Sequence, residues 1–149
     1  MIVLPDPQRD AIVRHAESDP AEECCGLMLG RFSDDGTKIV RELMSIDNAR
    51  ESEARHNRFL IGPVEMLKGE RHARSLGLDV VGIYHSHPNA PAVPSQFDLD
   101  HAWPVYSYII VAVTAQGAGA VRSWALREDR SGFDEEHIEA SANDSEPGR

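Results

Sequence analysis

The sequence contains few positive charges. Its 15 Lys and Arg residues, of which only two are lysines, stand against 25 Asp and Glu residues, so the formal net charge at pH 7 is −10. Proteins that bind nucleic acids neutralise phosphates with clustered Lys and Arg, and no such cluster occurs in this sequence. The same scarcity argues against binding to an anionic membrane surface. We therefore expect neither a nucleic-acid partner nor a membrane partner.

The sequence also lacks long hydrophobic runs and has little cysteine. Its longest apolar runs, such as Tyr108 to Val113, are much shorter than the ~20 residues that a membrane-spanning helix needs. The N-terminal segment MIVLPDPQRD has no basic region of the kind that begins a signal peptide. The cysteines Cys24 and Cys25 are adjacent, and neighbouring residues rarely reach unstrained disulfide geometry. We therefore expect reduced thiols and a cytoplasmic protein.

The length and composition are those of one globular domain. The chain has 149 residues, of which 41% are hydrophobic and 27% are charged. A chain of this length buries enough surface to form a hydrophobic core without disulfides. Residues 140–149 contain almost no apolar side chains, so we expect a disordered polar tail there. The sequence therefore predicts a single domain over residues 1–139.

Hydrophobic periodicity predicts an alternation of helices and strands that is typical of an α+β domain. Asp6 is expected to cap a first helix that runs to about Ser18, and Gly62 and Pro63 to begin a second helix that ends at Gly77. A short helix is expected to start near Ser95, and polar residues 47–55 to form a loop. Strands are predicted at 25–32, 38–46, 56–61, 79–85, 106–114 and 120–126, with a candidate edge strand at 133–138.

The most informative stretch is YHSHPNAPAVPSQFDLD, residues 84–100. Residues two apart on a strand point to the same face, so His85 and His87 are predicted to project side by side. Ser95 suits the N-cap of the short helix, and Asp98 falls in its first turn, where its carboxylate is available as a third ligand. Two imidazoles and one carboxylate, with a fourth position open to water, are typical of a catalytic zinc site. Helix capping explains Ser95 and Asp98 equally well, so these residues by themselves are compatible with both interpretations.

This run resembles the signature of the JAMM (MPN-type) zinc metalloproteases, in which His-x-His-Pro is followed by Ser-x-x-Asp at the spacing found here. That family also has a glutamate three residues before a glycine that leads into a strand, and here Glu23 precedes Gly26 in this way. The resemblance continues in RFLIGPVEM and VRSWAL and covers roughly residues 10–127. It implies an α+β fold with α/β/α-like layers, in which a curved mixed β-sheet is flanked by helices, similar in architecture to cytidine deaminases.

The resemblance also implies a role for each matched residue. His85, His87 and Asp98 would hold one zinc ion, and Glu23 would be the general base that moves a proton from the attacking water to the leaving amine. Ser95 would donate a hydrogen bond to the oxyanion of the tetrahedral intermediate. The expected activity is hydrolysis of an amide or isopeptide bond by a zinc metallopeptidase.

The length of the chain narrows the class of substrates that we expect. At 149 residues it has little room for the insertions that members cleaving ubiquitin chains carry around this core. It resembles the small stand-alone bacterial and archaeal members, which are associated with ubiquitin-like sulfur-carrier proteins and act after their terminal Gly-Gly or release a cysteine adduct from it. We therefore expect a small ubiquitin-like or sulfur-carrier protein, or a peptide, as substrate. Two alternatives remain: a non-catalytic scaffold of the same fold, and a cell-wall or phage-tail peptidase that uses the same site.

Overall fold

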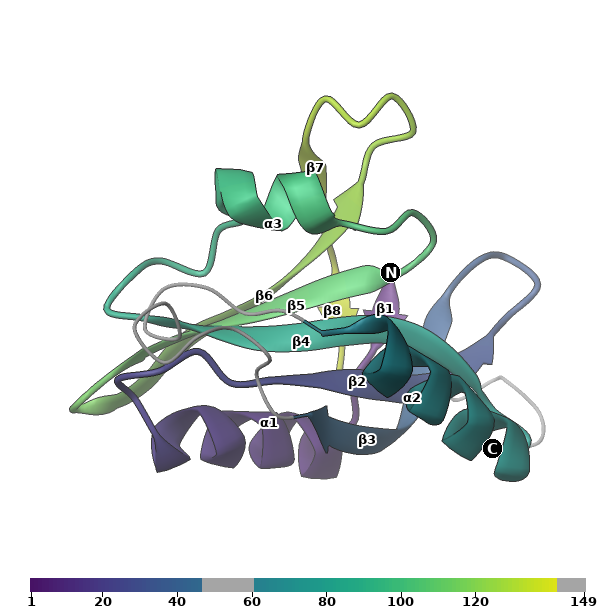
Figure 1. Ribbon diagram of the computed structural model, residues 1–149, viewed down its shortest axis with the longest axis horizontal. Coiled ribbons are helices and arrows are strands. Elements are labelled where there is room, and N and C mark those ends of the chain that lie inside the picture. Colours follow the sequence, from purple (N-terminus) through teal and green to yellow (C-terminus); the bar gives the residue numbers. More distant parts are fainter. Residues whose placement is uncertain (47–60, 142–149) are drawn as a thin grey trace.

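The computed structural model describes residues 1–46 and 61–141, which form a mixed β-sheet with helices on both faces (Figure 1). Its elements in chain order are β1 (Ile2–Val3), α1 (Asp6–Ser18), β2 (Cys25–Phe32), β3 (Lys38–Ile46), α2 (Pro63–Ser75), β4 (Asp79–Pro88), α3 (Gln96–His101), β5 (Ser107–Thr114), β6 (Gly117–Leu126), β7 (Phe133–Glu136) and β8 (Ile138–Glu139). The described strands form one eight-stranded sheet in the order β7-β6-β5-β4-β2-β3-β1-β8. Its pairs are antiparallel except for β4–β5, β1–β3 and β1–β8.

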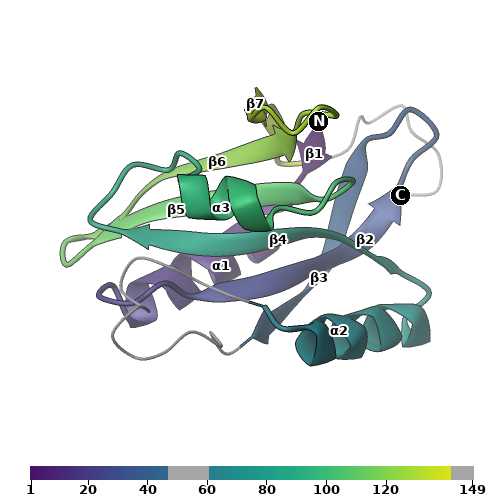
Figure 2. The same cartoon turned by 45° about the horizontal axis from the view of Figure 1, so that its top comes forward.

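The helices cover both faces of this sheet, which confirms the predicted fold class. Ile12 of α1 lies in one hydrophobic core together with Tyr84 of β4, whereas Met66 of α2 lies in a second core with Leu27 of β2. Figures 1 and 2 together place α3 over β4 and β5, on the side of the sheet opposite α1. Among the described residues, no helix is both long and apolar enough to cross a membrane.

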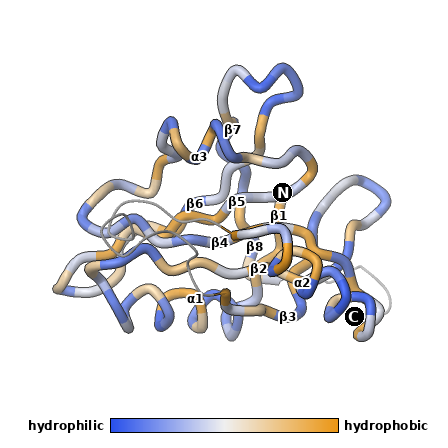
Figure 3. The backbone as a smooth tube through the Cα atoms, in the orientation of Figure 1, coloured by the Kyte–Doolittle hydropathy of each residue, from blue (hydrophilic) through white to orange (hydrophobic). Residues whose placement is uncertain are grey.

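The central strands β2 and β4 are buried on both faces over most of their length, which explains the hydrophobic sequence of β2 and of the first half of β4. Figure 3 shows hydrophobic residues within the sheet and hydrophilic residues at the turns. The second half of β4, YHSHP, is polar although most of it is buried. In β4, Ile83 belongs to the core against α2, and Tyr84 to the core against α1. Because successive side chains of a strand alternate between its faces, His85 and His87 continue the face of Ile83, and Ser86 continues that of Tyr84.

Several predicted boundaries agree with the structure, and one helix start does not. The strands predicted at 25–32 and 38–46 are β2 and β3 with the same bounds. The predicted cap of α1 is wrong, because the N-cap residue is Pro5 and no side chain caps this helix. Asp6 instead lies in the first turn, where its carboxylate interacts favourably with the helix dipole. α2 ends at Ser75, and Gly77 follows with a φ of +71°, a conformation that favours glycine.

The strands differ from the prediction at the end of β4 and near the two ends of the described chain. β4 continues to Pro88 instead of ending at His85. The predicted edge strand at 133–138 is two short strands, of which β7 pairs with β6 and β8 pairs with β1. β1 was not expected, because Ile2 and Val3 are too few residues to show a strand periodicity. Both are nevertheless buried, because β3 and β8 pair with β1 from either side and Ile2 packs in the core with Ile12.

Part of the prediction falls outside the described residues. This applies to the loop at 47–55, to the strand at 56–61 except for its last residue, and to residues 142–149 of the predicted tail. Ile61 is described and belongs to no strand. At the predicted domain boundary, β8 ends at Glu139, whose carbonyl oxygen accepts a hydrogen bond of 2.7 Å from the Leu4 amide. The boundary at Glu139 itself stays a prediction.

The contact between Gly26 and Tyr84 yields a stability prediction. A methyl group at Gly26 would overlap the ring of Tyr84, which is 2% exposed. We expect Gly26→Ala to lower the free energy of unfolding by about 1–3 kcal/mol, measured by urea denaturation. The control is Gly119→Ala on β6, where the added methyl meets Ala112 at an ordinary 3.9 Å. Equal stability of the two variants would contradict the close approach of β2 to Tyr84.

Candidate metal centre

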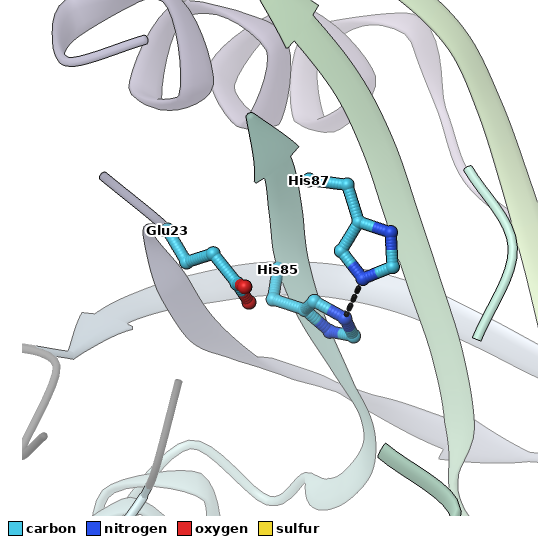
Figure 4. A group of neighbouring side chains, drawn as sticks. All are labelled: Glu23, His85 and His87. Atoms are coloured by element: carbon cyan, nitrogen blue, oxygen red, sulfur yellow. Dashed lines mark hydrogen bonds between the residues drawn. The ribbon is translucent and has the colours of Figure 1, made fainter. Parts of the chain in front are cut away.

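Two histidines converge at the end of β4. His85 and His87 project from the same face of the strand, and both are buried, with exposed fractions of 0% and 7%. Their Nε2 atoms lie 3.2 Å apart, and the two rings are tilted by 55° (Figure 4). The alternation of the strand therefore produces the side-by-side arrangement that the His-x-His spacing predicts.

Asp98 reaches the same two atoms from α3. Its Oδ2 lies 3.4 Å from Nε2 of His85 and 3.2 Å from Nε2 of His87. A capping box orients this carboxylate, because Oδ2 accepts a 2.8 Å hydrogen bond from the Ser95 amide while the Asp98 amide donates to Ser95 Oγ at 3.1 Å. The Ser-x-x-Asp spacing thus both starts α3 and points the Asp98 carboxylate at the histidines.

Glu23 comes to this cluster through the pairing of β2 with β4. Cys25 lies opposite His85 in the antiparallel register, so the residues just before Cys25 lie beside the end of β4. The Ser86 amide donates to the Cys24 carbonyl at 3.1 Å and extends this pairing by one residue. The side chain of Glu23 is buried, and its carboxylate lies beside both rings (Figure 4). One potential ligand atom from each of Glu23, His85 and His87 lies within 4.8 Å of the other two.

The second nitrogen of the His87 ring determines which tautomer faces the cluster. Nδ1 of His87 lies 2.9 Å from the carbonyl oxygen of Pro91. A carbonyl only accepts hydrogen bonds, so Nδ1 carries the donated hydrogen, and a neutral His87 presents a lone pair at Nε2. That lone pair faces an oxygen of Asp98 at 3.2 Å. Only a proton or a cation between these two atoms makes such an approach attractive.

Burial and the neighbouring groups shift the pKa values in this cluster. Burial lowers the pKa of His85, which favours its neutral form. Burial also lowers the pKa of His87, but hydrogen bonds with Asp98 and Pro91 outweigh it, so that the net shift is upward. Burial raises the pKa of Asp98, but the two histidines and the Ser95 amide outweigh it and hold this pKa far below its ordinary value. Asp98 is therefore a stable carboxylate, the form that binds metal ions.

The spacing of these donor atoms fits a four-coordinate metal ion. Nε2 of His85, Nε2 of His87 and Oδ2 of Asp98 are separated by 3.2, 3.2 and 3.4 Å. Ligands bound tetrahedrally to zinc at about 2.0–2.1 Å are about 3.3–3.4 Å from one another. Two imidazoles and one carboxylate also leave a fourth position for water or substrate. The donor set of this chain is thus suited to an open zinc-type site.

The structure brings together the residues that the sequence singled out. Glu23, His85, His87 and Asp98 meet in one buried cluster, and Ser95 is bound to Asp98 at its edge. Two partners of the cluster were missed, namely the Pro91 carbonyl and the Ser86 hydroxyl, which accepts from the Cys24 amide at 2.9 Å. The central position of Ser86 in His-Ser-His predicts that it faces away from the metal centre. Its contact with Cys24 follows only once β2 is known to pair with β4.

Known proteins are similar to this chain over most of its length. The family model described as prokaryotic homologs of the JAB domain matches residues 5–127. "Desampylase" of Haloferax volcanii is 35% identical over 128 residues, which cover 82% of this chain and 86% of that protein. "Probable TtuB-protein conjugate cleaving protease" of Thermus thermophilus is 31% identical over 115 residues, which cover 76% of this chain and 68% of that protein.

Solved structures show the same fold. A protein from Salinibacter ruber, solved in solution, superposes with a TM-score of 0.73 at 38% identity and covers 97% of this chain and 94% of its own. A JAB1/MPN domain protein from Archaeoglobus fulgidus has a TM-score of 0.54 at 22% identity, with coverages of 93% and 95%. The predicted mixed-sheet architecture is therefore that of the JAB1/MPN fold. With the family model matching most of its length, the chain belongs to the prokaryotic JAB-domain family and is a JAMM-type metallopeptidase.

Proposed function

We propose that this chain hydrolyses the amide or isopeptide bond that follows the C-terminal Gly-Gly of a ubiquitin-like or sulfur-carrier protein. The observation that carries the proposal is the convergence of Glu23, His85, His87 and Asp98 in one buried cluster, with an exposed Ser95 at its edge. Such a set combines metal ligands, a carboxylate base and a hydroxyl donor, which together suffice for hydrolysis of an amide.

The metal ligands in this proposal are His85, His87 and Asp98, with zinc as the ion. Neutral imidazole nitrogens and a carboxylate are ligands that zinc accepts, and their mutual distances fit tetrahedral coordination. Zinc bound there would supply a Lewis acid and would lower the pKa of the attacking water to about 7. The hydrogen bond between His87 and Pro91 orients the His87 ring for this role, as the outer partners of metal-bound histidines do.

Glu23 is the proposed general base. Its carboxylate lies beside both histidines. With His85, His87 and Asp98 as the proposed ligands, this carboxylate is left to take up a proton. In the proposed cycle, Glu23 accepts the proton of the attacking water and delivers it to the nitrogen of the departing amine. Its burial excludes bulk water from this proton transfer and strengthens its interactions with nearby charges.

Ser95 is the proposed donor to the oxyanion. Its hydroxyl oxygen accepts the Asp98 amide, and a hydroxyl has two acceptor positions and one hydrogen to donate. Capping α3 therefore leaves the hydroxyl hydrogen available. Ser95 is exposed, so a substrate carbonyl can approach this hydrogen from solvent. A donor placed at the developing negative charge stabilises the transition state more than the ground state.

The names of the relatives support the class of substrate. One is a desampylase, and the other is named as a probable protease that cleaves TtuB-protein conjugates. Both align with this chain over more than three quarters of its length. We further propose that the protein acts in the cytoplasm, because Cys24 and Cys25 both carry a thiol, which suits a reducing compartment.

The proposed activity predicts cleavage of a defined conjugate. The zinc-loaded chain should release a ubiquitin-like protein ending in Gly-Gly from a conjugate with a lysine side chain, as mass spectrometry of the products would show. A conjugate in which the final Gly-Gly is replaced by Ala-Ala is the matched control and should be cleaved much more slowly. Cleavage of cell-wall peptides with no action on either conjugate would favour the cell-wall peptidase. A chain that binds no zinc would support the scaffold.

The assignment of Glu23 predicts a separation of metal binding from catalysis. Glu23→Gln should bind about one zinc ion per chain, as the wild type does, because the proposed ligands are unchanged. Its kcat should fall by a factor of about 10² or more, since an amide cannot accept the proton. Elemental analysis and single-turnover assays measure the two effects. Full activity of Glu23→Gln would refute this base, and loss of zinc would make Glu23 a ligand instead.

The assignment of Ser95 predicts different outcomes for its capping and its donating roles. Ser95→Ala should lower kcat by a factor of about 10²–10³ and lower the free energy of unfolding by about 1 kcal/mol through loss of the cap. Ser95→Asp caps the helix equally well but has no hydrogen to donate, so its stability should recover while its kcat stays low. Recovery of kcat in Ser95→Asp would show that capping alone explains the effect of Ser95→Ala.

A further inference from the structure

Ser86 lies between the two histidines but on the opposite face of β4. It is fully buried, with an exposed fraction of 0%. Its hydroxyl oxygen accepts a 2.9 Å hydrogen bond from the Cys24 amide, and its own amide donates to the Cys24 carbonyl at 3.1 Å. Ser86 therefore holds both main-chain polar groups of the residue that directly follows Glu23.

We propose that the Ser86 hydroxyl is a positioning group for the Glu23 carboxylate, which rests on the proposed function of Glu23 as the base. Ser86 acts through the main chain of Cys24 and touches neither the substrate nor the metal. It fixes where β2 begins, and with it the distance between Glu23 and the two histidines.

The position of Glu23 in the fold shows which part of the main chain Ser86 supports. The ladder between β2 and β4 begins at Cys25, so Glu23 lies two residues beyond the last paired residue. On its N-terminal side the chain makes a turn, in which the Glu22 amide donates to the Asp19 carbonyl at 3.3 Å and the Ala21 amide donates to Asp19 Oδ1 at 3.3 Å. The contacts with Ser86 extend the attachment of β2 to β4 up to the residue next to Glu23. A side chain thus continues the pairing where the regular ladder stops.

The same strand residue also links the base to the metal ligands. The main chain of β4 carries His85 and His87 on one face, while Ser86 holds the Cys24 main chain on the other. Three consecutive residues of one strand, His85, Ser86 and His87, therefore position the proposed base and two of the proposed metal ligands relative to one another. Displacement of a catalytic group by about 1 Å lowers the rate by a factor of up to about 10². A short connection through Ser86 and Cys24 limits such a displacement of Glu23.

Removal of the hydroxyl has a specific consequence for the main chain. Without Ser86 Oγ, the Cys24 amide loses its acceptor, and a polar group left unsatisfied near the protein interior is unfavourable. The segment that carries Glu23 will then move until this amide finds another partner. The rings of His85 and His87 point to the other face, so the proposed metal ligands keep their places.

Three substitutions at Ser86 distinguish the effect of losing the hydroxyl from the effect of changing the size of the side chain. Ser86→Ala removes the hydroxyl, Ser86→Cys keeps the size but provides only a weak acceptor, and Ser86→Thr keeps the hydroxyl. The matched control is Ser123→Ala on β6, which removes another fully buried serine hydroxyl, one that donates to Glu136 at 2.8 Å. Thermal unfolding identifies any variant that has not folded. If Ser86→Ala or Ser86→Cys fails to fold, the other of the two is compared with the wild type.

The first measurement follows the hydrogen bond itself by amide hydrogen exchange in the zinc-loaded full chain. Exchange of the Cys24 amide should be at least tenfold faster in Ser86→Ala and Ser86→Cys than in the wild type. It should stay within about threefold in Ser86→Thr and Ser123→Ala, because protection reports the local opening of this bond. Zinc should remain at about one ion per chain throughout. Unchanged Cys24 exchange in both Ser86→Ala and Ser86→Cys would overturn the proposal independently of any activity.

The second measurement tests whether Ser86 acts through Glu23. We expect kcat on the Gly-Gly conjugate to fall about tenfold in Ser86→Ala and Ser86→Cys, with KM within about twofold, and to recover in Ser86→Thr. Adding Ser86→Ala to Glu23→Gln should lower kcat by less than twofold, because the base is already absent. An equal loss in both backgrounds would overturn the proposal. A wild-type chain that cleaves no conjugate would instead contradict the proposed function.

Discussion

The antiparallel pairing of β2 with β4 is the constraint on which the metal centre depends. It places Cys25 opposite His85 and Gly26 opposite Tyr84, so the start of one strand meets the end of the other. The absence of a side chain at Gly26 lets the Tyr84 ring pack directly against the main chain of β2. Glu23 reaches the histidines only in this register, since a slip of one residue would turn every side chain of β2 to the other face.

Neighbouring protein groups orient the polar side chains of the centre. The capping box orients Asp98, the Pro91 carbonyl orients His87, and strand alternation aligns His85 with it. Burying these groups is unfavourable by itself, and their mutual attraction together with the Ser95 amide offsets part of that penalty. The donor atoms thus have the spacing of a tetrahedral coordination shell.

The short helix α3 shows how a structural and a chemical role share one residue. A helix of six residues is not stable by itself, so its capping box and the stacking of Phe97 on His101, with ring centroids 4.0 Å apart, contribute to its formation. The capping box uses an acceptor position of the Ser95 hydroxyl and leaves its hydrogen available. Capping and the proposed oxyanion role therefore do not compete, although both interpretations explain the same serine in the sequence.

The sequence by itself determined the features that depend on near neighbours along the chain. Strand alternation predicts that His85 and His87 share a face, Ser-x-x-Asp predicts the start of α3, and the motif spacing predicts the family. The contact of Ser86 with Cys24 was decided only by the tertiary structure, as was β1, which is paired from both sides. The family resemblance implies that Glu23 acts beside the histidines, but the pairing of β2 with β4 that brings it there is visible only in the structure. These contacts join segments far apart in sequence, and their geometry follows from strand order and register, which periodicity within a single strand does not contain.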